Sequence, residues 1–310
     1  MRTASVLRAA SLLAPPFVVV ACTLNVQSVD RTVVSEASAD IATLRSDLDA
    51  VGLGHAAVVV VPTPGTPTVG LLVRGLLAFD RDLDDVLSRV RADFDTSDTA
   101  ATGLRFSLEG TREEAIAVEG IELALHRGTA LDLSTTQGSV EVRGLEADAR
   151  IVASSGSIDV TDALDVELRA SSGSIRVEAQ RGVLEASSGS IDFALTGAVE
   201  GHATSGSIHG RFGGGGELTC TSGSLDLELL GPLDRDLTLT TDSGSITLVV
   251  PPGLAARVEA RAGTGSVDVS VGAVEHRGGD DFVGEVGDGA TFVLRATADS
   301  GSVHIVERGR

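Results

Sequence analysis

The sequence contains no lysine, no tryptophan and no tyrosine, and these absences exclude several classes of function. Its 24 basic residues are all arginines, and 44 acidic residues outnumber them to give a formal net charge of −20. Nothing resembles the basic patch by which proteins bind nucleic acid or an anionic lipid surface. The aromatic stacking platforms of single-stranded nucleic-acid binders are missing as well, because only eight Phe are present. We therefore expect no nucleic-acid partner.

Motifs for covalent or phosphoryl-transfer chemistry are also missing. A Walker-type G-x-x-x-x-G-K-[ST] loop needs the absent lysine, and no G-x-S-x-G nucleophile elbow occurs. A zinc site needs three or four converging ligands, and among the six histidines only His202 and His209 are close in sequence. We therefore expect no catalytic residues, no metal site and no cofactor. Asp280, Asp281 and Asp288 leave open whether segment 274–290 binds a cation weakly.

The first 22 residues have the pattern of an export signal. Arg2 and Arg8 form a positive region, and the apolar run 9–20 that follows is too short, and too interrupted by two prolines, to span a membrane. The run ends Val-Val-Ala-Cys, which resembles the lipobox of bacterial lipoproteins. The resemblance implies that residues 1–21 are removed as a signal peptide and that Cys22 is lipidated. The alternative is an ordinary signal peptide with a coincidental cysteine.

The chain has two cysteines, and lipidation of Cys22 would leave Cys220 without a disulfide partner. We therefore expect Cys220 to be a buried free thiol. The lipobox resemblance also implies a location, namely a lipid anchor in the bacterial cell envelope. Thr23 follows the cysteine in place of the Asp associated with inner-membrane retention, which favours the outer membrane if the cell has two membranes.

A Gly-Ser pair followed by Ile, Val or Leu recurs along the chain. Its glycines are Gly138, Gly156, Gly173, Gly189, Gly206, Gly223, Gly244, Gly265 and Gly301. Most intervals are about 17–21 residues, and the last is longer. On both sides of each pair apolar residues alternate with polar ones, which is the period of a strand with one buried face. Each repeat therefore predicts a strand, a corner and a second strand.

The residues at the corner have a physical role in this interpretation. Glycine adopts backbone angles that other residues reach only at a cost, so a sharp bend selects it. If the repeats stack, the adjacent serines can form a hydroxyl ladder that satisfies backbone groups at the corner. A column of small side chains stands three residues before the glycine: Ala153, Ala170, Ala186, Ala203, Cys220, Thr241 and Ala262.

Periodicity alone is compatible with an antiparallel meander as well as with parallel stacking. One column favours parallel, in-register stacking. Three residues after the glycines stand Asp159, Arg176, Asp192, His209, Asp226, Thr247 and Asp268. Acids alternate with cationic or neutral residues, so repeats stacked about 4.8 Å apart would not set two acids side by side. We therefore predict an all-β parallel solenoid or β-helix with Ser-Gly-Ser corners.

The repeated S/T-G-S-I-x-V phrase behind a signal peptide resembles a bacterial family of domains of unknown function described as putative adhesins. The resemblance covers residues 110–310 and implies a single-stranded β-solenoid, although an acidic residue often follows the glycine in that family, where this chain has serine. We expect three parts: a lipoprotein signal peptide (1–21), irregular strands and a cap (22–110), and the solenoid (111–310). Segments 57–62 and 68–79 predict strands, 83–90 a helix, and 274–290 a loop emerging from the stack.

Two classes of function remain compatible with these features. The first is a non-catalytic envelope lipoprotein that adheres or scaffolds at the cell surface, with a surface polymer or an envelope protein as its partner. The second is an envelope enzyme acting on polysaccharide, because β-helices also host polysaccharide lyases. Grooves of that kind usually need cations for uronates and aromatics for sugars, and this chain has no Lys, Trp or Tyr. The sequence therefore favours the non-catalytic class.

Overall fold

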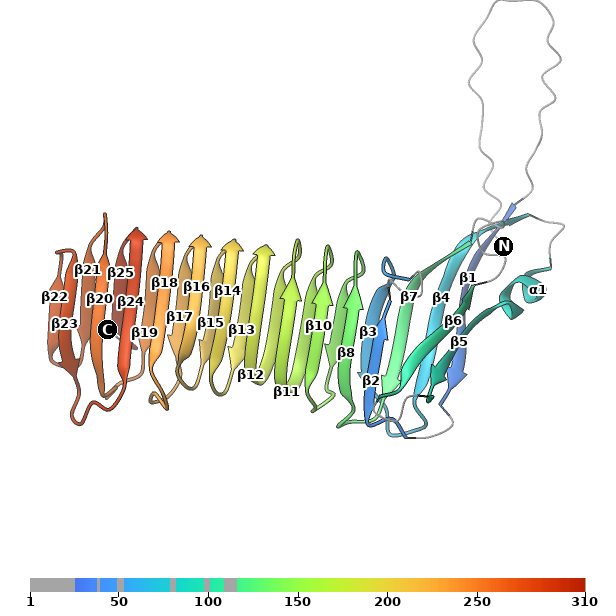
Figure 1. Ribbon diagram of the computed structural model, residues 1–310, viewed down its shortest axis with the longest axis horizontal. Coiled ribbons are helices and arrows are strands. Elements are labelled where there is room, and N and C mark those ends of the chain that lie inside the picture. Colours follow the sequence, from blue (N-terminus) through green and yellow to red (C-terminus); the bar gives the residue numbers. More distant parts are fainter. Residues whose placement is uncertain are drawn as a thin grey trace, which may run out of the picture.

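The computed structural model describes residues 26–37, 40–48, 53–78, 82–97, 101–108 and 116–309. This part of the chain is all-β apart from one short helix, α1 (Leu83–Ser88). Its strands form one long sheet of 23 strands and a separate two-stranded sheet, in an elongated molecule (Figure 1). The predicted signal peptide and Cys22 lie outside the described residues. Within the described ranges, no helix has the length and hydropathy needed to span a bilayer.

Parallel pairing connects the repeats. The strands leading into the corners are β8 (Ala130–Thr135), β10 (Ala149–Ala153), β14 (Val199–Ser205), β16 (Gly216–Ser222), β18 (Leu237–Ser243) and the second halves of β11 (Ile158–Ala170) and β12 (Ile175–Ser188). The strands leaving the corners are β9 (Val140–Arg143), β13 (Ile191–Leu195), β15 (Ile208–Phe212), β17 (Leu225–Leu229), β19 (Ile246–Val250) and the first halves of β11 and β12. Ile175 lies between Ile158 and Ile191, in the register that the glycines define. The same parallel register continues through β15, β17 and β19. An antiparallel meander is therefore excluded for these strands.

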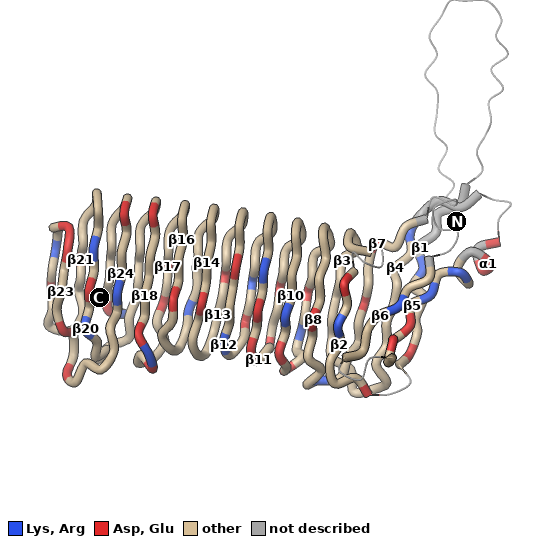
Figure 2. The backbone as a smooth tube through the Cα atoms, in the orientation of Figure 1, with Lys and Arg blue, Asp and Glu red and all other residues tan. Residues whose placement is uncertain are grey.

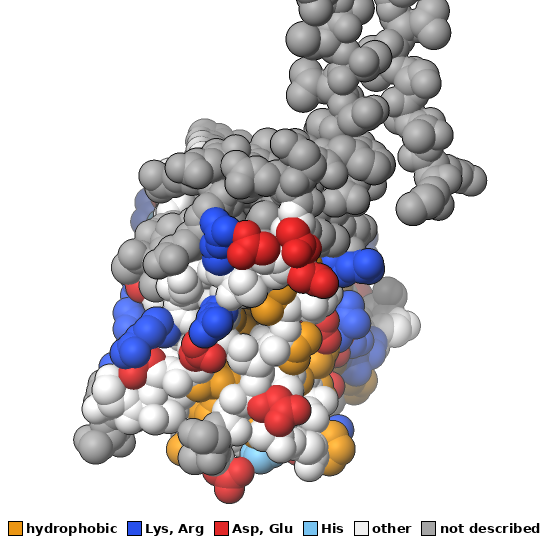
Figure 3. All heavy atoms as spheres, turned by 90° about the vertical axis from the view of Figure 1, so that its right-hand side faces the viewer, with side chains coloured by type: hydrophobic (Ala, Val, Ile, Leu, Met, Phe, Trp, Pro, Cys, Tyr) orange, Lys and Arg blue, Asp and Glu red, His pale blue; other side chains and the backbone are white. Residues whose placement is uncertain are grey.

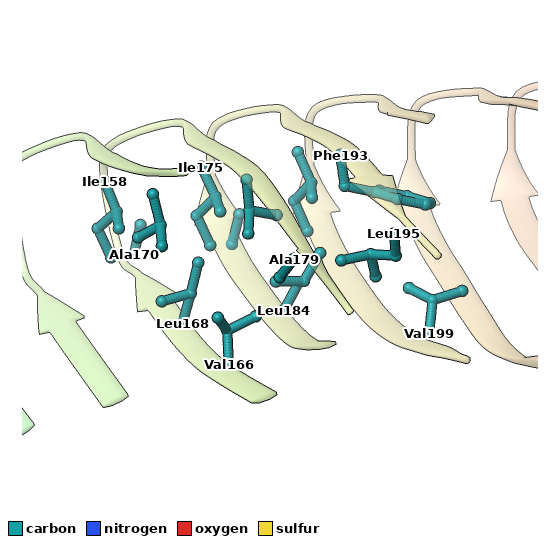
Figure 4. Close-up of a cluster of buried hydrophobic side chains, with 14 of the residues drawn as sticks. Ile158, Val166, Leu168, Ala170, Ile175, Ala179, Leu184, Phe193, Leu195 and Val199 are labelled. Atoms are coloured by element: carbon teal, nitrogen blue, oxygen red, sulfur yellow. The ribbon is translucent and has the colours of Figure 1, made fainter. Parts of the chain in front are cut away.

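The core is a row of apolar side chains enclosed between the two sets of strands (Figure 4). Ile158, Leu168, Ile175 and Leu184 are each at most 1% exposed. Fully burying an aliphatic side chain of this size stabilises the fold by about 1.5–3 kcal/mol. Because the side chains alternate along each strand, the same pattern that buries these residues turns their polar neighbours outward.

Two glycines in core columns make room for large neighbours. A Cβ atom at Gly210 would lie 2.6 Å from the ring of Phe193, and one at Gly201 would lie 2.5 Å from Cδ2 of Leu218. The Phe193 and Phe212 rings pack together with centroids 6.1 Å apart. The volume missing at the glycines is therefore supplied by the adjacent repeats, which keeps the core filled.

The N-terminal part adds antiparallel strands to the end of the stack. β1 (Val26–Glu36) pairs with β4 (Thr68–Ala78), and β4 pairs with β7 (Ile116–Leu125). β3 (Ala57–Pro62) joins them to the stack by parallel pairing with both β7 and β9, and β2 (Thr43–Asp47) pairs in parallel with β8. The strands predicted over 57–62 and 68–79 are thus present. Viewed from this end, charged side chains of both signs surround apolar ones (Figure 3).

The helix predicted over 83–90 is shorter than expected. It ends at Ser88, and Val90–Asp95 forms strand β5, which pairs antiparallel with β6 (Gly103–Leu108). Val90 and Ala92 are buried while Arg91 is exposed, so the strand period replaces the helical one at this point. Pairing with β6, more than ten residues further along the chain, outweighs the weak local helical pattern.

The C-terminal repeat does not follow the order of the sequence. β24 (Val293–Ser300) and β25 (Val303–Glu307) lie between β18–β19 and the preceding pair β20 (Ala256–Ala262) and β21 (Val267–Val271). The last corner in the sequence, Gly301, therefore stacks on Gly244, and Gly265 stacks on Gly301. Every repeat presents the same corner, so any two repeats can stack in register whatever their distance along the chain.

The predicted loop 274–290 is mostly β-structure, and this prediction was wrong. β22 (Val274–Arg277) pairs antiparallel with β21, and β23 (Asp281–Val286) pairs antiparallel with β20. These strands lie at the far end of the stack (Figure 1). The sequence did not predict these strands because polar residues dominate the segment and few of its apolar side chains reach the core. Val274 and Phe282 are half-buried, and within this segment only Val286 is fully buried. They also occupy the long interval of the sequence before Gly301.

Candidate binding surface

Close backbone contact between neighbouring corners explains the invariant glycine in this chain. A Cβ atom at Gly156 would lie 2.0 Å from the carbonyl oxygen of Gly138, and one at Gly173 would lie 2.1 Å from that of Gly156. Equivalent distances from 1.8 to 2.4 Å apply at the other seven corners. No real Cβ atom approaches a backbone oxygen so closely, and the oxygen belongs to a backbone held on both sides. Each corner therefore requires glycine because a neighbouring backbone lies against it, that of another corner glycine in eight cases and that of Ala56 at Gly138.

The bend itself requires glycine at fewer positions than the sequence suggested. Gly206, Gly223, Gly244 and Gly301 have φ between 142° and 156°, which residues with a Cβ atom rarely adopt. The other five corner glycines have no positive φ in that region. The predicted reason, a special backbone angle, thus applies to four of the nine corners, whereas the close contact applies to all of them.

The serine after each glycine joins neighbouring corners. The backbone N–H of Ser157 donates to the Ser139 hydroxyl at 3.3 Å, and that of Ser224 donates to the Ser207 hydroxyl at 3.3 Å. The ladder continues from Ser224 through Ser245 and Ser302 to Ser266, with distances of 3.2 Å. The serine carbonyls accept hydrogen bonds from the next strand, as in Ile158 N to Ser174 O at 3.0 Å. The predicted ladder is present between Ser139 and Ser157 and from Ser207 to Ser266, where it follows the spatial order of the repeats.

The column of small side chains contributes a second link between corners. The Thr241 hydroxyl donates to Gly223 O at 2.8 Å, and the Cys220 thiol donates to Gly206 O at 3.0 Å. Cys220 is a free cysteine and is fully buried, as expected. Burial raises the pKa of its thiol, and the negative charge of Asp242 raises it further. This cysteine is therefore a packing residue and not a reactive one.

Between the corners of Gly156 and Gly223, exposed Ser and Thr residues directly before the corner glycines form a row that we call the hydroxyl edge. Its members are Ser154, Ser155, Ser171, Ser172, Ser187, Ser188, Thr204, Ser205 and Ser222. Their backbones are fixed by bonds between repeats, such as Ser172 N to Ser154 O at 2.9 Å. Beyond the hydroxyl edge, towards the C-terminal end of the stack, the corresponding positions include the exposed acidic residues Asp242 and Asp299 (Figure 2). The edge thus presents rigid, uncharged hydroxyls at the spacing of the strands. Sequence reasoning assigned these serines to the ladder and missed their exposure.

The outer faces carry rows of opposite charges. On the face formed by the strands that lead into the corners, Arg45 bonds Asp132 at 2.8 Å, Arg169 bonds Glu185 at 2.8 Å and Arg295 bonds Glu259 at 3.0 Å. These pairs are exposed, and each contributes about 0–1 kcal/mol. Hydrogen bonds from Arg295 and Arg257 hold the pKa of Glu259 below its usual value. The arginines of these faces are therefore paired with acidic neighbours, and the excess of acidic residues leaves the chain with its net charge of −20.

The predicted charge column on the strands that leave the corners is present with two changes. Asp159, Arg176, Asp192, His209, Asp226 and Thr247 are neighbours in that order. Asp268 is not beside Thr247, because His304 lies between them with its Nδ1 atom 3.1 Å from Asp268 Oδ2. Two acids do meet at the start of the column, where Asp159 lies beside Glu141. Glu141 has an ion pair with Arg143, which offsets this repulsion.

The surface depressions of the described chain are open grooves. One has a volume of about 610 Å³ and lies over Ala179 and Ala194, with the exposed Leu164 and Leu230 at its sides. Another, of about 490 Å³, contains the ion pair Asp165–Arg181. It also contains two exposed carboxylates that are neighbours across strands, Glu200 and Glu217. Neither groove encloses a small molecule in the way that ligand pockets usually do.

The residues considered for metal binding do not come together. Within the ranges that the structure describes, no group of three His, Cys, Asp or Glu side chains could hold a metal ion. His202 and His209 are exposed and lie on β14 and β15, one on each side of the Gly206 corner. His276 packs against Phe282 with ring centroids 5.2 Å apart. Asp280, Asp281 and Asp288 are exposed at the far end of the stack.

The sequence matches no protein-family model, and a comparison with curated proteins finds no match. Among solved structures, the chain is similar to a protein from Bacteroides fragilis described as a putative adhesin. The identity is 12%, the TM-score is 0.38, and the alignment covers 91% of this chain and 97% of that one. It is also similar to a protein from Clostridium sporogenes described as a putative cell adhesion protein, at 10% identity and a TM-score of 0.23, over 90% and 100% of the two chains. Likeness at these scores carries no argument about function.

Proposed function

We propose that this protein is a non-catalytic lipoprotein of the bacterial cell envelope, anchored through a lipid on Cys22. In this proposal its repeats form a β-solenoid with rungs of about 17–21 residues, and its outer surface binds a surface polymer or an envelope protein. The function is adhesion or scaffolding at the cell surface. If the cell has two membranes, the anchor is in the outer one.

The hydroxyl edge is the observation that supports this proposal most. Exposed hydroxyls repeat there from Ser154 to Ser222, on a backbone fixed by hydrogen bonds between repeats. Hydroxyls about 4.8 Å apart can donate to and accept from a long polar ligand at many points without any change in the protein. A ligand held in this way gains affinity from many weak contacts, and none of them requires an enclosed pocket. The charged column from Asp159 to Asp226 offers a second row of the same kind on the adjoining face.

Two matched variants test which row binds. The edge variant is Ser171→Ala, Ser187→Ala and Thr204→Ala, and the face variant is Asp159→Asn, Asp192→Asn and Asp226→Asn. Both leave buried residues unchanged, so both should melt close to the wild type. Binding to isolated envelope polysaccharide and to envelope proteins is measured by co-sedimentation. We expect the edge variant to weaken binding at least tenfold and the face variant to alter it less.

The enzymatic alternative has a direct test. Purified protein is incubated with envelope and plant polysaccharides, and the products are measured for new reducing ends and for unsaturated uronates. Glu200→Gln and Glu217→Gln are compared with the wild type, because these two carboxylates are neighbours in an open groove. Degradation that the variants abolish, together with unchanged adhesion of a strain lacking the protein, would overturn the adhesive proposal.

A further inference from the structure

The larger of the two grooves described above is symmetric about one residue, Ala194. This residue pairs with Glu178 on β12 at one side and with Arg211 on β15 at the other. The two charged residues therefore lie about 4.8 Å from Ala194 in opposite directions along the stack. All three residues line the groove. An anion and a cation thus stand at equal distances from the centre of one exposed face.

The exposed leucines of the groove have the same symmetry. Leu164 lies on β11, two strands from β13 on one side, and Leu230 follows β17, two strands from β13 on the other side. Their side chains are 38% and 42% exposed, and both line the same groove. Each leucine is therefore about 9.6 Å from the centre of the groove along the stack.

The charges of Glu178 and Arg211 are not used within the part of the chain that the structure describes. Both side chains are exposed, and neither has an ion-pair partner among the described residues. Arg211 lies beside Glu228, but Glu228 forms an ion pair with Arg308 at 2.7 Å. Glu178 has the uncharged Ala194 as its neighbour on β13. Each of the two charges is therefore available to a partner of opposite sign.

A twofold axis makes this face complementary to itself. When two copies meet face to face with the axis along β13, their stacks run antiparallel. Each residue then meets the residue at equal distance on the other side of β13. Arg211 meets Glu178 of the second copy, and Leu164 meets Leu230 of the second copy. Packed sheets lie about 10 Å apart, and the alanines in the floor of the groove leave room for the long charged side chains between the sheets.

The other face-to-face arrangement with twofold symmetry is unfavourable. With the axis along the stack, the two copies would lie parallel. Arg211 would then meet Arg211, and Glu178 would meet Glu178. Like charges held opposite each other at an interface oppose association. Only the antiparallel arrangement joins opposite charges.

We propose that this groove is the contact surface between two copies of this chain that lie antiparallel and face to face. A second copy fits better than an unrelated partner, because it supplies a carboxylate, a guanidinium and two leucines at the spacings that the groove requires. The contact covers few strands compared with interfaces that bury about 800 Å² per partner, so each pair is weak. Resting on the anchor proposed at Cys22, the two copies belong to two opposing envelopes, because antiparallel stacks hold their anchored ends apart.

The proportions of the stack suit this arrangement. From β13, seven successive strand pairings lead to β1. Six pairings lead from β13 to β22 at the far end. The anchored end is therefore about 34 Å from the centre of the contact and the free end about 29 Å. The free end of each copy stops short of the anchored end of the other, and many weak pairs between two surfaces add up to firm adhesion.

Charge reversals test the pairing in solution. Full chains that carry Cys22→Ala, and so have no lipid, are compared by sedimentation velocity over a wide range of concentration. We expect the parent chain to dimerise. Glu178→Arg and Arg211→Glu should each weaken dimerisation about tenfold, because each places like charges in contact at two points. An equimolar mixture of the two variants should form a heterodimer as readily as the parent, since an arginine then meets a glutamate at both points.

Two further variants make the result specific to the groove and to its antiparallel arrangement. A chain with both reversals should dimerise by itself when the copies are antiparallel, but would repel itself if they were parallel. Glu217→Arg is the matched control, because Glu217 is exposed on β16 outside the groove. This control should leave dimerisation unchanged, and all variants should melt like the parent. A parent chain that stays monomeric at every concentration, or a mixture that associates no better than the single variants, would overturn the pairing.

Cells test the opposing envelopes separately. Two strains carry the lipidated protein with Glu178→Arg in one and Arg211→Glu in the other. Neither strain should clump by itself, whereas a mixture of the two strains should clump. Dimerisation in solution without clumping of the mixed strains would contradict the opposing envelopes. Cys22→Ala should abolish clumping and leave dimerisation in solution intact, so a failure of the anchor is distinguishable from a failure of the groove.

Discussion

At the scale of single residues, contacts between repeats determine which amino acids are tolerated at the corners. Gly189 has no positive φ, yet a Cβ atom there would lie 2.2 Å from Gly173 O. Cys220 and Thr241 replace alanine in the small column and use the extra atom to bond the neighbouring corner. The position three residues before the glycine can therefore hold either a methyl group or a hydrogen-bond donor. The position of the glycine itself accepts no side chain.

Gly189→Ala tests the reason for the invariant glycine. If the bend alone required glycine, alanine would be tolerated here because φ is not in the left-handed region. Because the new methyl group meets a fixed carbonyl, we expect a loss of about 2–3 kcal/mol in the free energy of unfolding. Gly65→Ala is the control, since its Cβ atom would make an ordinary 3.6 Å contact, and urea denaturation of both variants gives the comparison. A neutral Gly189→Ala would disprove the role of the contact.

Cys220 should be inert in the folded protein. Its thiol is buried and donates to Gly206 O, so labelling by a thiol reagent should require unfolding. Cys220→Ala removes the donor and should lower stability by about 1 kcal/mol. Cys220→Thr should lose less, because Thr241 makes the equivalent hydrogen bond one repeat away. Fast labelling of the native protein would show that this strand faces outward.

The raised pKa of Cys220 predicts a dependence of stability on alkaline pH. The thiol ionises at a lower pH in the unfolded chain, near pH 8.5, than in the folded protein. The contribution of the protonated thiol to stability is thus complete below the pKa that it has in the unfolded chain. This contribution is lost as the pH rises through the higher pKa that the thiol has in the folded protein. Between pH 8 and 10 the wild type should lose more stability than Cys220→Ala. Identical pH profiles in urea denaturation would contradict the assignment.

At the scale of strands, alternation of buried and exposed residues determines each repeat, and the neighbours decide where that repeat is placed. β24–β25 and β20–β21 have equivalent patterns, yet the later pair lies closer to β18–β19. β22 and β23 run antiparallel to the stack and end the run of parallel pairing. Reversing the strand direction in this way interrupts the edge on which a further parallel repeat would otherwise stack.

The order of the last repeats can be checked within one chain. Thr297 on β24 lies between Thr240 on β18 and Arg261 on β20. Thr240→Cys with Thr297→Cys should form an internal disulfide readily, since adjacent parallel positions are within reach. Thr240→Cys with Arg261→Cys should not, because another strand separates the two residues. A non-reducing gel and mass spectrometry of the peptides give the result, and the opposite preference would mean that the repeats follow the order of the sequence.

At the scale of the whole molecule, an elongated stack presents long regular faces and no enclosed site among its described residues. Its hydroxyl edge is uncharged from Ser154 to Ser222, and its flat faces carry opposite charges side by side (Figure 2). A lipid at Cys22 would hold one end of such a stack at a membrane and leave the faces accessible. The proposed adhesive function depends on this combination of anchor and surface.

Cys22→Ala tests the anchor. Without the thiol no acyl chain can be attached, and an acylated lipoprotein needs more than one chain for stable attachment. We expect the variant to move from the membrane fraction to the soluble fraction, while the wild type stays in the membrane after a high-salt wash. Fractionation and mass spectrometry of the N-terminal peptide measure this. Retention of the unacylated variant after the same wash would contradict the lipoprotein assignment.

The sequence by itself was sufficient to predict the repeats, their corners, the parallel register and the burial of Cys220, because each depends on a pattern that recurs at the same position of successive repeats. It did not reveal that glycine is required by the carbonyl of an adjacent corner, since that atom belongs to another repeat. It did not place β24–β25 inside the stack or show that Val90–Asp95 and 274–290 form strands. Nor did it show that the serines of the corner edge are exposed. Equivalent repeats can stack in any order, and weakly patterned segments take the structure that their partners impose, so only the contacts between distant parts of the chain determine these features.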